Sequence, residues 1–245
     1  MNNEMIFGLR AVIEAVEAGK DIDKILLRKG LQSELAQELF AAIRGLEITV
    51  QYVPVERLDR VTRKNHQGVI AFLSAISYAP LEEIVPSLYE EGKLPFIVLL
   101  DGITDVRNFG AIARTCACAG VDAIIIPAQG SVSVQGDAVK TSAGALLTLP
   151  VCKERNLHKT LTYLKGSGFT IIAATEKGSV SYTEIDYRTP VCLVMGAEDT
   201  GIPTAHLALC DHRASIPMLG NIASLNVSVA AGVFIYEVVN QRIKP

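Results

Sequence analysis

Short continuous apolar runs alternate with segments of helical spacing from residue 95 onward. The runs predict strands at residues 96–100, 123–126, 169–173, 191–195 and 213–216. The segments that follow them predict helices at residues 108–118, 135–147, 156–166 and 226–240. Strands that are apolar throughout and alternate with helices are typical of a parallel sheet covered by helices on both faces.

The first 75 residues predict a smaller α/β unit. Strands are expected at residues 24–28, 48–53 and 68–73, and helices at residues 9–18, at 33–44 and after Pro54. Ser33 is a suitable N-terminal cap for the second of these helices. The fold class is therefore α/β, with an N-terminal domain at 1–75, a linker of one or two helical turns at 76–94, and a second domain at 95–245.

Composition narrows the class of protein. Hydrophobic residues make up 49% of the 245 residues and charged residues 20%, which excludes a disordered or coiled-coil chain. No apolar run approaches the roughly 20 residues of a membrane span, and Met1–Glu4 shows no signal peptide. We therefore expect a soluble cytoplasmic protein. A net charge of −3 argues against indiscriminate nucleic-acid binding.

The five cysteines and four histidines do not predict a metal site. No cysteine pair has zinc-ribbon spacing, and no two histidines form an HxxxH pair. Cys116 and Cys118 are expected on different faces of one helix. The apolar surroundings of most cysteines suit buried thiols in a reducing compartment.

The segment 57–66 is locally basic. Its cationic side chains are Arg57, Arg60, Arg63 and Lys64. A short run of this kind is usually a solvated surface. The alternative is a contact with RNA phosphates, and the sequence leaves both interpretations open.

Ligands of a parallel sheet bind beyond the carboxyl ends of its strands, which directs attention to loops 101–108, 196–203 and 217–226. In the first loop, Asn108 is a candidate helix cap. Arg114 follows it on a helix of otherwise small and apolar residues. It either forms a structural salt bridge, lies on an exposed stripe, or binds a phosphate or carboxylate.

The other two loops combine glycines with polar side chains. Gly196 and Gly201 allow a ligand to approach the backbone closely, although ordinary turns also use glycine. Glu198 lies where ligand groups gather, or simply belongs to a polar turn. Ser224 or Asn226 can cap the last helix, whose N-terminus would also offer free N–H groups to a ligand. All three loops lack the glycine fingerprints of dinucleotide-binding and P-loop proteins.

Together these loops resemble motifs 1, 2 and 3 of the SpoU branch of the SPOUT RNA ribose 2′-O-methyltransferases. The matching segments are DGITDVRNFGAIART, LVMGAEDTGIP and IPMLGNIASLNVSVA, in the family's order. Near the N-terminus, IFGLRAV and HQGVIA resemble the substrate-binding domain of the RlmB type, which methylates a guanosine ribose of 23S ribosomal RNA.

The resemblance implies a second domain whose parallel sheet is threaded as a deep trefoil knot. It implies S-adenosylmethionine as the cofactor, without a metal. The residues expected to line the cofactor pocket are Gly196, Gly201, Ile216, Met218 and Leu225. It also implies a homodimer in which the last helix lies at the interface and Arg114 acts in the partner's site.

The expected reaction is methyl transfer to a ribose 2′-hydroxyl of RNA, with a guanosine of large-subunit ribosomal RNA as the target. The catalytic positions that match the family are Asn108, Arg114, Glu198, Ser224 and Asn226. The resemblance implies that Arg114 acts either as the base or as the anchor of an RNA phosphate, and we favour the anchor because a guanidinium stays protonated in proteins. Transfer RNA as the target, and a non-catalytic RNA-binding assembly factor, are the alternatives.

Overall fold

The computed structural model describes residues 5–46 and 48–243. They form two compact units. The first comprises the chain up to Ser77 together with Ser133–Asp137, and the second comprises Tyr78–Val132 and the chain from Ala138 onward. None of the helices in these ranges is long and apolar enough to cross a membrane.

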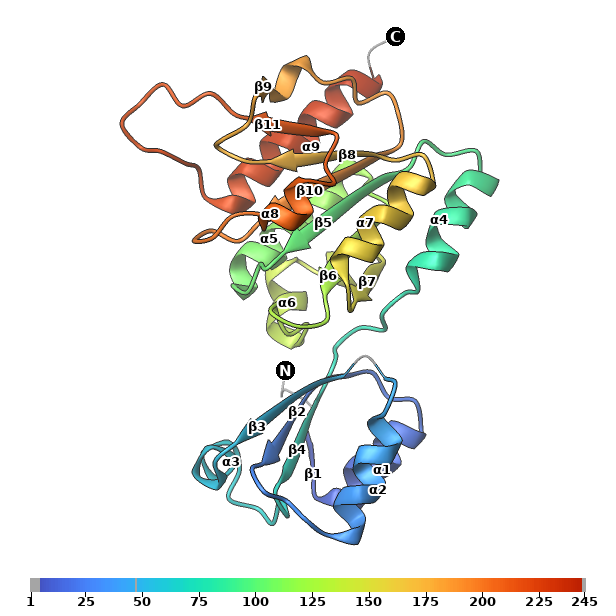
Figure 1. Ribbon diagram of the computed structural model, residues 1–245, viewed down its shortest axis with the longest axis vertical. Coiled ribbons are helices and arrows are strands. Elements are labelled where there is room, and N and C mark those ends of the chain that lie inside the picture. The colour runs from blue at the N-terminus through green and yellow to red at the C-terminus, as the bar shows by residue number, and fades with distance from the viewer. Residues whose placement is uncertain (1–4, 47, 244–245) are drawn as a thin grey trace. The chain divides into compact units, whose positions relative to one another are not determined.

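The first unit contains, within its described residues, a four-stranded mixed sheet in the order β1-β4-β2-β3. The strands are β1 (Met5–Phe7), β2 (Ile22–Arg28), β3 (Thr49–Val53) and β4 (Val69–Leu73), and the helices are α1 (Leu9–Glu17), α2 (Glu34–Ile43) and α3 (Val55–Val61). Helices α1 and α2 cover one face, where Ile13, Ile25 and Leu39 are buried (Figure 1). Helix α3 covers part of the other face through Leu58.

Two residues outside the helices fix the N-termini of α1 and α2. Ser33 caps α2 as predicted, because its Oγ accepts the Ala36 N–H at 3.1 Å. Helix α1 has no such cap of its own, and the Leu9 N–H donates to Gln67 Oε1 at 3.0 Å instead. The start of α1 is therefore fixed by a loop far along the chain.

His66 ties that loop to α3. Its Nδ1 accepts the Gly68 N–H at 3.0 Å, so the proton lies on Nε2, which donates to Asp59 Oδ1 at 2.9 Å. With Gln67 at a positive φ of 52°, the three residues His66, Gln67 and Gly68 hold α1 and α3 in place. This part of the HQGVIA segment thus has a structural role.

The second unit is built, within its described residues, on a seven-stranded sheet in which every pairing is parallel. The strands, in the order β7-β6-β5-β10-β8-β11-β9, are β5 (Phe96–Asp101), β6 (Ala123–Pro127), β7 (Val151–Glu154), β8 (Thr170–Ala174), β9 (Val180–Ser181), β10 (Val191–Gly196) and β11 (His212–Ser215). The α-helices after Tyr78 are α4 (Leu81–Glu90), α5 (Val106–Ala119), α6 (Gly136–Thr141), α7 (Leu157–Gly166), α8 (Thr204–Leu207) and α9 (Val227–Ile243).

Helices cover both faces of this sheet, as the apolar strands predict (Figure 1). On one face α4, α7 and α8 pack against a core that includes Val85, Leu161 and Ile171. On the other face α9 packs against β8, β10 and α5, with Phe109 and Phe234 buried. The parallel α/β architecture expected for this part of the chain is confirmed, and the trefoil knot stays a prediction.

The structure differs from the expected elements in the segment 76–94. Pro80, Pro86 and Gly92 indicated a linker. Most of the segment instead forms α4, which includes Pro86 and buries Leu81 and Val85 in the core of the second unit. Burial of these apolar side chains outweighs the unfavourable effect of an internal proline on a helix.

Short strands and helix breaks were also not anticipated. Strands β1, β7 and β9 have only two to four residues each, too few for a periodic pattern to be recognised. The single helix expected at 135–147 is divided into α6 and a 3₁₀ turn at Ala145–Leu147, because Ala143 and Gly144 adopt a positive φ.

Candidate functional site

Strand order brings the sequence motifs to one edge of the sheet. Strands β5 and β10 are neighbours, with Asp101 opposite Gly196, and β8 lies between β10 and β11. From β5 the chain adds β6 and β7 on one side of the sheet, and the later strands β8, β10 and β11 lie on the other side of β5. The strand order therefore reverses between β5 and β10, and ligands of open parallel sheets bind at such a reversal.

A cavity of about 450 Å³ lies at this edge. Its walls are the loops after β8, β10 and β11 together with the first turns of α9. The lining includes all the expected cofactor residues, Gly196, Gly201, Ile216, Met218 and Leu225, and also the expected catalytic residues Glu198, Ser224 and Asn226. Its volume falls within the range of roughly 300–1,000 Å³ typical of small-molecule sites.

The loop after β10 is a tight turn that folds back on the strand. A Cβ atom at Gly196 would lie 2.4 Å from the Gly201 carbonyl carbon and 2.5 Å from the Ile202 nitrogen. The Gly201 N–H also donates to the Ala197 carbonyl at 2.9 Å. Only glycine fits at Gly196, so a side chain there would force open the turn that lines the cavity.

Asn226 joins the polar residues of the three motifs. Its Nδ2 donates to Asn108 Oδ1 at 3.0 Å and to Glu198 Oε1 at 2.7 Å. Its Oδ1 accepts the Ser228 N–H at 3.0 Å and the Ser228 hydroxyl at 2.6 Å. Within the described residues, Asn108 Nδ2 and Glu198 Oε2 have no partner, so the cluster presents a free donor beside a free acceptor.

The side chain of Asn108 is available for this cluster because another residue caps its helix. We expected Asn108 to cap its helix, but α5 begins at Val106 and is capped by Asp105. Asp105 Oδ1 accepts the N–H groups of Asn108 and Arg107 at 3.0 and 2.8 Å, and these hydrogen bonds hold the pKa of Asp105 below its ordinary value. Of the two candidate caps for α9, Asn226 fills the role, through the Ser228 N–H.

Arg114 lies outside this cluster. Its side chain is exposed on α5 and does not line the cavity. The structural salt bridge considered from the sequence is not found among the described residues. Helix α5 packs closely on α9, since a Cβ atom at Gly232 would lie 4.0 Å from Thr115 Cγ2. Arg114 is therefore a free cation on an exposed surface of the described chain.

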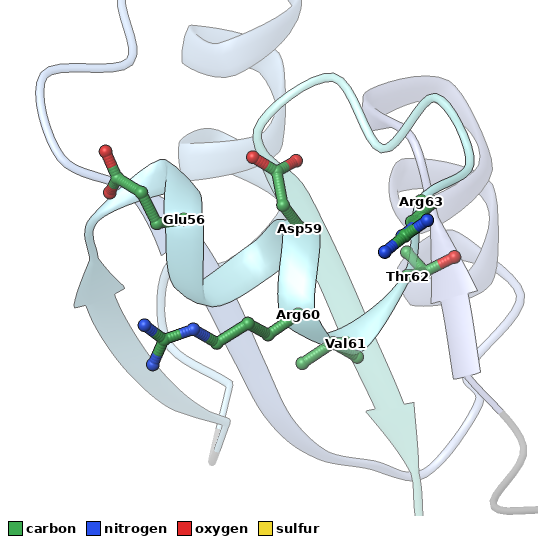
Figure 2. Close-up of a pocket in the computed structure, with 6 residues that line it drawn as sticks. All are labelled: Glu56, Asp59, Arg60, Val61, Thr62 and Arg63. Carbon is green, nitrogen blue, oxygen red and sulfur yellow. The ribbon is translucent and has the colours of Figure 1, made fainter.

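The basic segment of the first unit lies on α3 and the loop after it. Arg57, Arg60, Arg63 and Lys64 are all exposed. Arg60 and Arg63 contribute to a surface hollow formed by residues 56 and 59–63, and Arg60 projects from α3 away from the acidic side chains (Figure 2). Both sequence interpretations, solvated surface and RNA contact, require this exposure.

Two features at this edge of the sheet were not indicated by the sequence motifs. The loop at Thr175–Lys177 forms a wall of the cavity because β8 lies between β10 and β11. His206 Nδ1 donates to Asp101 Oδ2 at 2.6 Å, although the two residues are 105 positions apart. Both depend on the order of the strands, which the sequence pattern does not reveal.

The cysteines and histidines form no metal centre in residues 5–46 and 48–243, where no cluster of three or more suitable ligands occurs. Cys116 is buried and Cys118 is exposed, as their spacing predicts. Burial raises the pKa of the Cys152 thiol to about 12, which leaves it protonated and unreactive at neutral pH.

Family models match both units. Residues 95–236 match the SpoU rRNA Methylase family, and residues 5–79 match the domain described as RNA 2′-O ribose methyltransferase substrate binding. Among curated relatives, a putative TrmH family tRNA/rRNA methyltransferase of Staphylococcus saprophyticus is 35% identical over 242 residues, covering 99% of this chain and 97% of the relative.

Solved structures agree with this assignment. The AdoMet-bound rRNA methyltransferase of Sinorhizobium meliloti is 27% identical with a TM-score of 0.63, covering 98% of this chain and 88% of that one. The TrmH/SpoU tRNA modifying enzyme of A. aeolicus is 32% identical with a TM-score of 0.55, covering 66% of this chain and 84% of that one. This chain therefore belongs to the SpoU methylase family of RNA methyltransferases.

Proposed function

We propose that the protein transfers a methyl group from S-adenosylmethionine to the 2′-hydroxyl of a guanosine in large-subunit ribosomal RNA. One observation carries the proposal: Asn226 is hydrogen-bonded to both Asn108 and Glu198, and Asn226 and Glu198 line a cavity together with the expected cofactor residues. Three motifs that are far apart in the sequence thus contribute to a single site.

The cavity fits the cofactor in size and chemistry. Ile216, Met218, Leu225 and Phe234 supply apolar surface for an adenine ring, and the turn at Gly196 places backbone within reach. When bound, S-adenosylmethionine supplies a methyl group already activated by its sulfonium. The protein then has to align the acceptor and accept its proton.

The two polar atoms of the cluster that have no partner among the described residues can both form hydrogen bonds with a ribose 2′-hydroxyl. A ribose 2′-hydroxyl is both a donor and an acceptor of hydrogen bonds. Asn108 Nδ2 can donate to its oxygen, and Glu198 Oε2 can accept its hydrogen, while Asn226 holds both side chains in place. Ser224, which lines the cavity beside them, helps to shape the loop and hold the substrate.

Arg114 anchors an RNA phosphate, and in a homodimer it does so in the partner's site. Helix α9 supports a dimer because Val229, Tyr236 and Ile243 are 51%, 50% and 75% exposed, at intervals of seven residues along one stripe. Apolar side chains at that spacing are typical of a helix that packs against another surface. Arg114 itself is exposed on the neighbouring helix.

Ribosomal RNA is favoured over transfer RNA by the first unit. The rRNA methyltransferase of S. meliloti aligns with 98% of this chain, whereas the tRNA modifying enzyme of A. aeolicus aligns with 66%. In the first unit, Arg57, Arg60, Arg63 and Lys64 provide exposed positive charge for phosphates. The curated relatives named tRNA/rRNA methyltransferase keep transfer RNA as the second candidate.

Transfer of a labelled methyl group tests this function. Unmodified large-subunit ribosomal RNA and transfer RNA are supplied as acceptors to the wild type and to Arg114→Ala. We expect label on ribosomal RNA with the wild type and roughly 100-fold less with the variant, since a bound phosphate loses its anchor. Label on transfer RNA alone would show that ribosomal RNA is not the substrate. RNA binding without any label, also on precursor particles, would favour the assembly factor.

A further inference from the structure

The loop after β8, at Thr175–Gly178, belongs to none of the three sequence motifs. It nevertheless forms a wall of the cavity, because β8 lies between β10 and β11. Lys177 is the one cationic side chain among the described lining residues, which otherwise carry the acidic side chains of Glu176, Glu198 and Asp199.

The backbone at Lys177 is held firmly in place. The Thr175 N–H donates to the Ala214 carbonyl of β11 at 2.9 Å, and the Lys177 N–H donates to Thr175 Oγ1 at 3.3 Å. A Cβ atom at Gly178 would lie 2.5 Å from both the Ala214 carbonyl carbon and the Ser215 nitrogen. The turn is thus pressed against β11, and its position relative to the cavity is fixed.

The Lys177 ammonium is available for a ligand. Its side chain is exposed, and it has no hydrogen-bond or ion-pair partner within the described residues. S-adenosylmethionine carries one anionic group, the carboxylate at its methionine end, together with a cationic amino group and a sulfonium. With Glu198 assigned to the ribose, Glu176 and Asp199 remain to suit the two cations, and Lys177 suits the carboxylate.

We propose that Lys177 binds the methionine carboxylate of S-adenosylmethionine. This inference rests on the proposed function, which places the cofactor in this cavity. An RNA phosphate is the other anion that Lys177 could meet. The order of the strands favours the carboxylate. Strand β5 precedes Asn108, which we assign to the RNA ribose, and β8 precedes Lys177. Because β10 lies between these two strands, Lys177 is separated from the place where the RNA would bind.

Two nucleoside ligands separate these possibilities. S-adenosylhomocysteine retains the amino-acid end of the cofactor, whereas 5′-methylthioadenosine keeps the adenosine and sulfur but lacks the carboxylate. Their dissociation constants are measured by calorimetry with the wild type, Lys177→Gln and Lys177→Arg. Lys159→Gln is the matched control, since Lys159 is exposed on α7 and lies outside the cavity lining.

We expect Lys177→Gln to weaken binding of S-adenosylhomocysteine about fivefold and to leave that of methylthioadenosine within about twofold. Lys177→Arg keeps the charge and should restore most of the affinity. The loss should shrink as salt is raised, because the pair is exposed. Lys159→Gln should bind both ligands as the wild type does.

Equal weakening of both ligands, or of neither, would overturn the role of Lys177 while leaving the cofactor cavity intact. If Lys177→Gln bound S-adenosylhomocysteine with unchanged affinity but bound a ribosomal RNA fragment more weakly, Lys177 would be assigned to an RNA phosphate. That result would also overturn its role in binding the carboxylate. A wild type that binds neither nucleoside would instead refute the cavity as the cofactor site, and so the proposed function itself.

Discussion

The side-chain amide of Asn226 uses both of its polar atoms within the chain. Both Nδ2 hydrogens are directed to Asn108 and Glu198, and Oδ1 accepts twice from Ser228. A short planar amide is suited to this arrangement, because it provides two donors on one atom and an acceptor on the other. The residue therefore caps α9 and orients two motif side chains at once.

Asn226→Asp should greatly slow methyl transfer with little loss of stability. The substitution replaces the two donors by a carboxylate oxygen facing the Glu198 carboxylate, which it repels. We expect kcat to fall by about 100-fold or more, while the free energy of unfolding changes by about 1 kcal/mol or less, because the side chain is exposed and aspartate can still cap α9. A variant that retains more than roughly a tenth of wild-type kcat would contradict the role of Asn226.

The hydrogen bonds of Asp211 predict that the stability of the fold depends on pH. Burial raises the pKa of its carboxyl, but hydrogen bonds from Lys165 Nζ at 2.7 Å and from the Ile171 N–H at 2.8 Å outweigh burial, so the pKa lies below its ordinary value. A lowered pKa in the folded protein stabilises it above the unfolded pKa, and this contribution is lost as pH falls through the folded value.

Asp211→Asn should therefore lower the free energy of unfolding by up to about 1 kcal/mol at neutral pH, because solvent screens this partly exposed pair, and the deficit should disappear in acid. Denaturant unfolding at neutral pH and at several increasingly acidic values provides the measurement. Glu184→Gln is a suitable control, since Glu184 is exposed in the same unit. A deficit that stays constant down to the lowest pH at which the protein folds would exclude this linkage.

At the scale of residues, the sequence motifs identified the chemistry but not all of the partners. Glu198, Ser224 and Asn226 follow strands whose carboxyl ends were expected to meet, and the structure brings them to one cavity. Lys177 carries no motif, and only the strand order makes it part of the cavity lining. His206 also carries no motif, and it lies outside the lining but is paired with Asp101 at the end of β5.

At the scale of elements, the Asp101–His206 pair joins β5 to α8. Asp101 is the last residue of β5, and His206 lies on α8, which follows the loop that begins at Gly196. The hydrogen bond between them therefore holds the C-terminal end of this loop against β5. The Asp101 side chain is only 10% exposed. Loss of His206 would leave a nearly buried carboxylate without this partner, which is costly.

His206→Ala should lower the free energy of unfolding by about 2–4 kcal/mol and weaken binding of S-adenosylhomocysteine. Adding Asp101→Asn to that variant should recover part of the stability, because an amide is less costly to bury than a carboxylate. Chemical unfolding and calorimetry of the single and double variants give both quantities. Strictly additive losses would show that the two side chains do not act as a pair.

Elements with strong patterns were predicted well and weak ones were not. The apolar strands β5, β8 and β10 and the helix α7 all lie where the sequence placed them. Helix α4 was missed because Pro86 interrupts its pattern, and its stability comes from tertiary burial, which a local pattern does not record.

The whole molecule is expected to act as a dimer. Within the described chain, the apolar stripe of α9 is exposed to solvent, and Arg114 on the adjacent helix is exposed and has no ion-pair partner. A dimer would bury the stripe and bring each Arg114 to the partner's site. The order of strands, and whether the chain is knotted, are properties at this scale that no local pattern predicts.

Coexpression of two inactive variants tests the exchange of Arg114. If Arg114 acts across the interface, a heterodimer of Arg114→Ala and Asn226→Asp has one intact site. Random pairing then restores about a quarter of wild-type activity in the mixture. Differently tagged subunits allow the heterodimer to be purified and assayed. Absence of any recovery in a purified heterodimer would place Arg114 in the site of its own chain.

We propose that the three motif loops form one site for methylation of a ribose 2′-hydroxyl. The most direct measurement is to digest methylated ribosomal RNA to nucleosides and to identify the modified one by mass spectrometry. We predict 2′-O-methylguanosine with the wild type and its loss with Asn226→Asp. A methyl group on a base, or undiminished ribose methylation by the variant, would contradict the account.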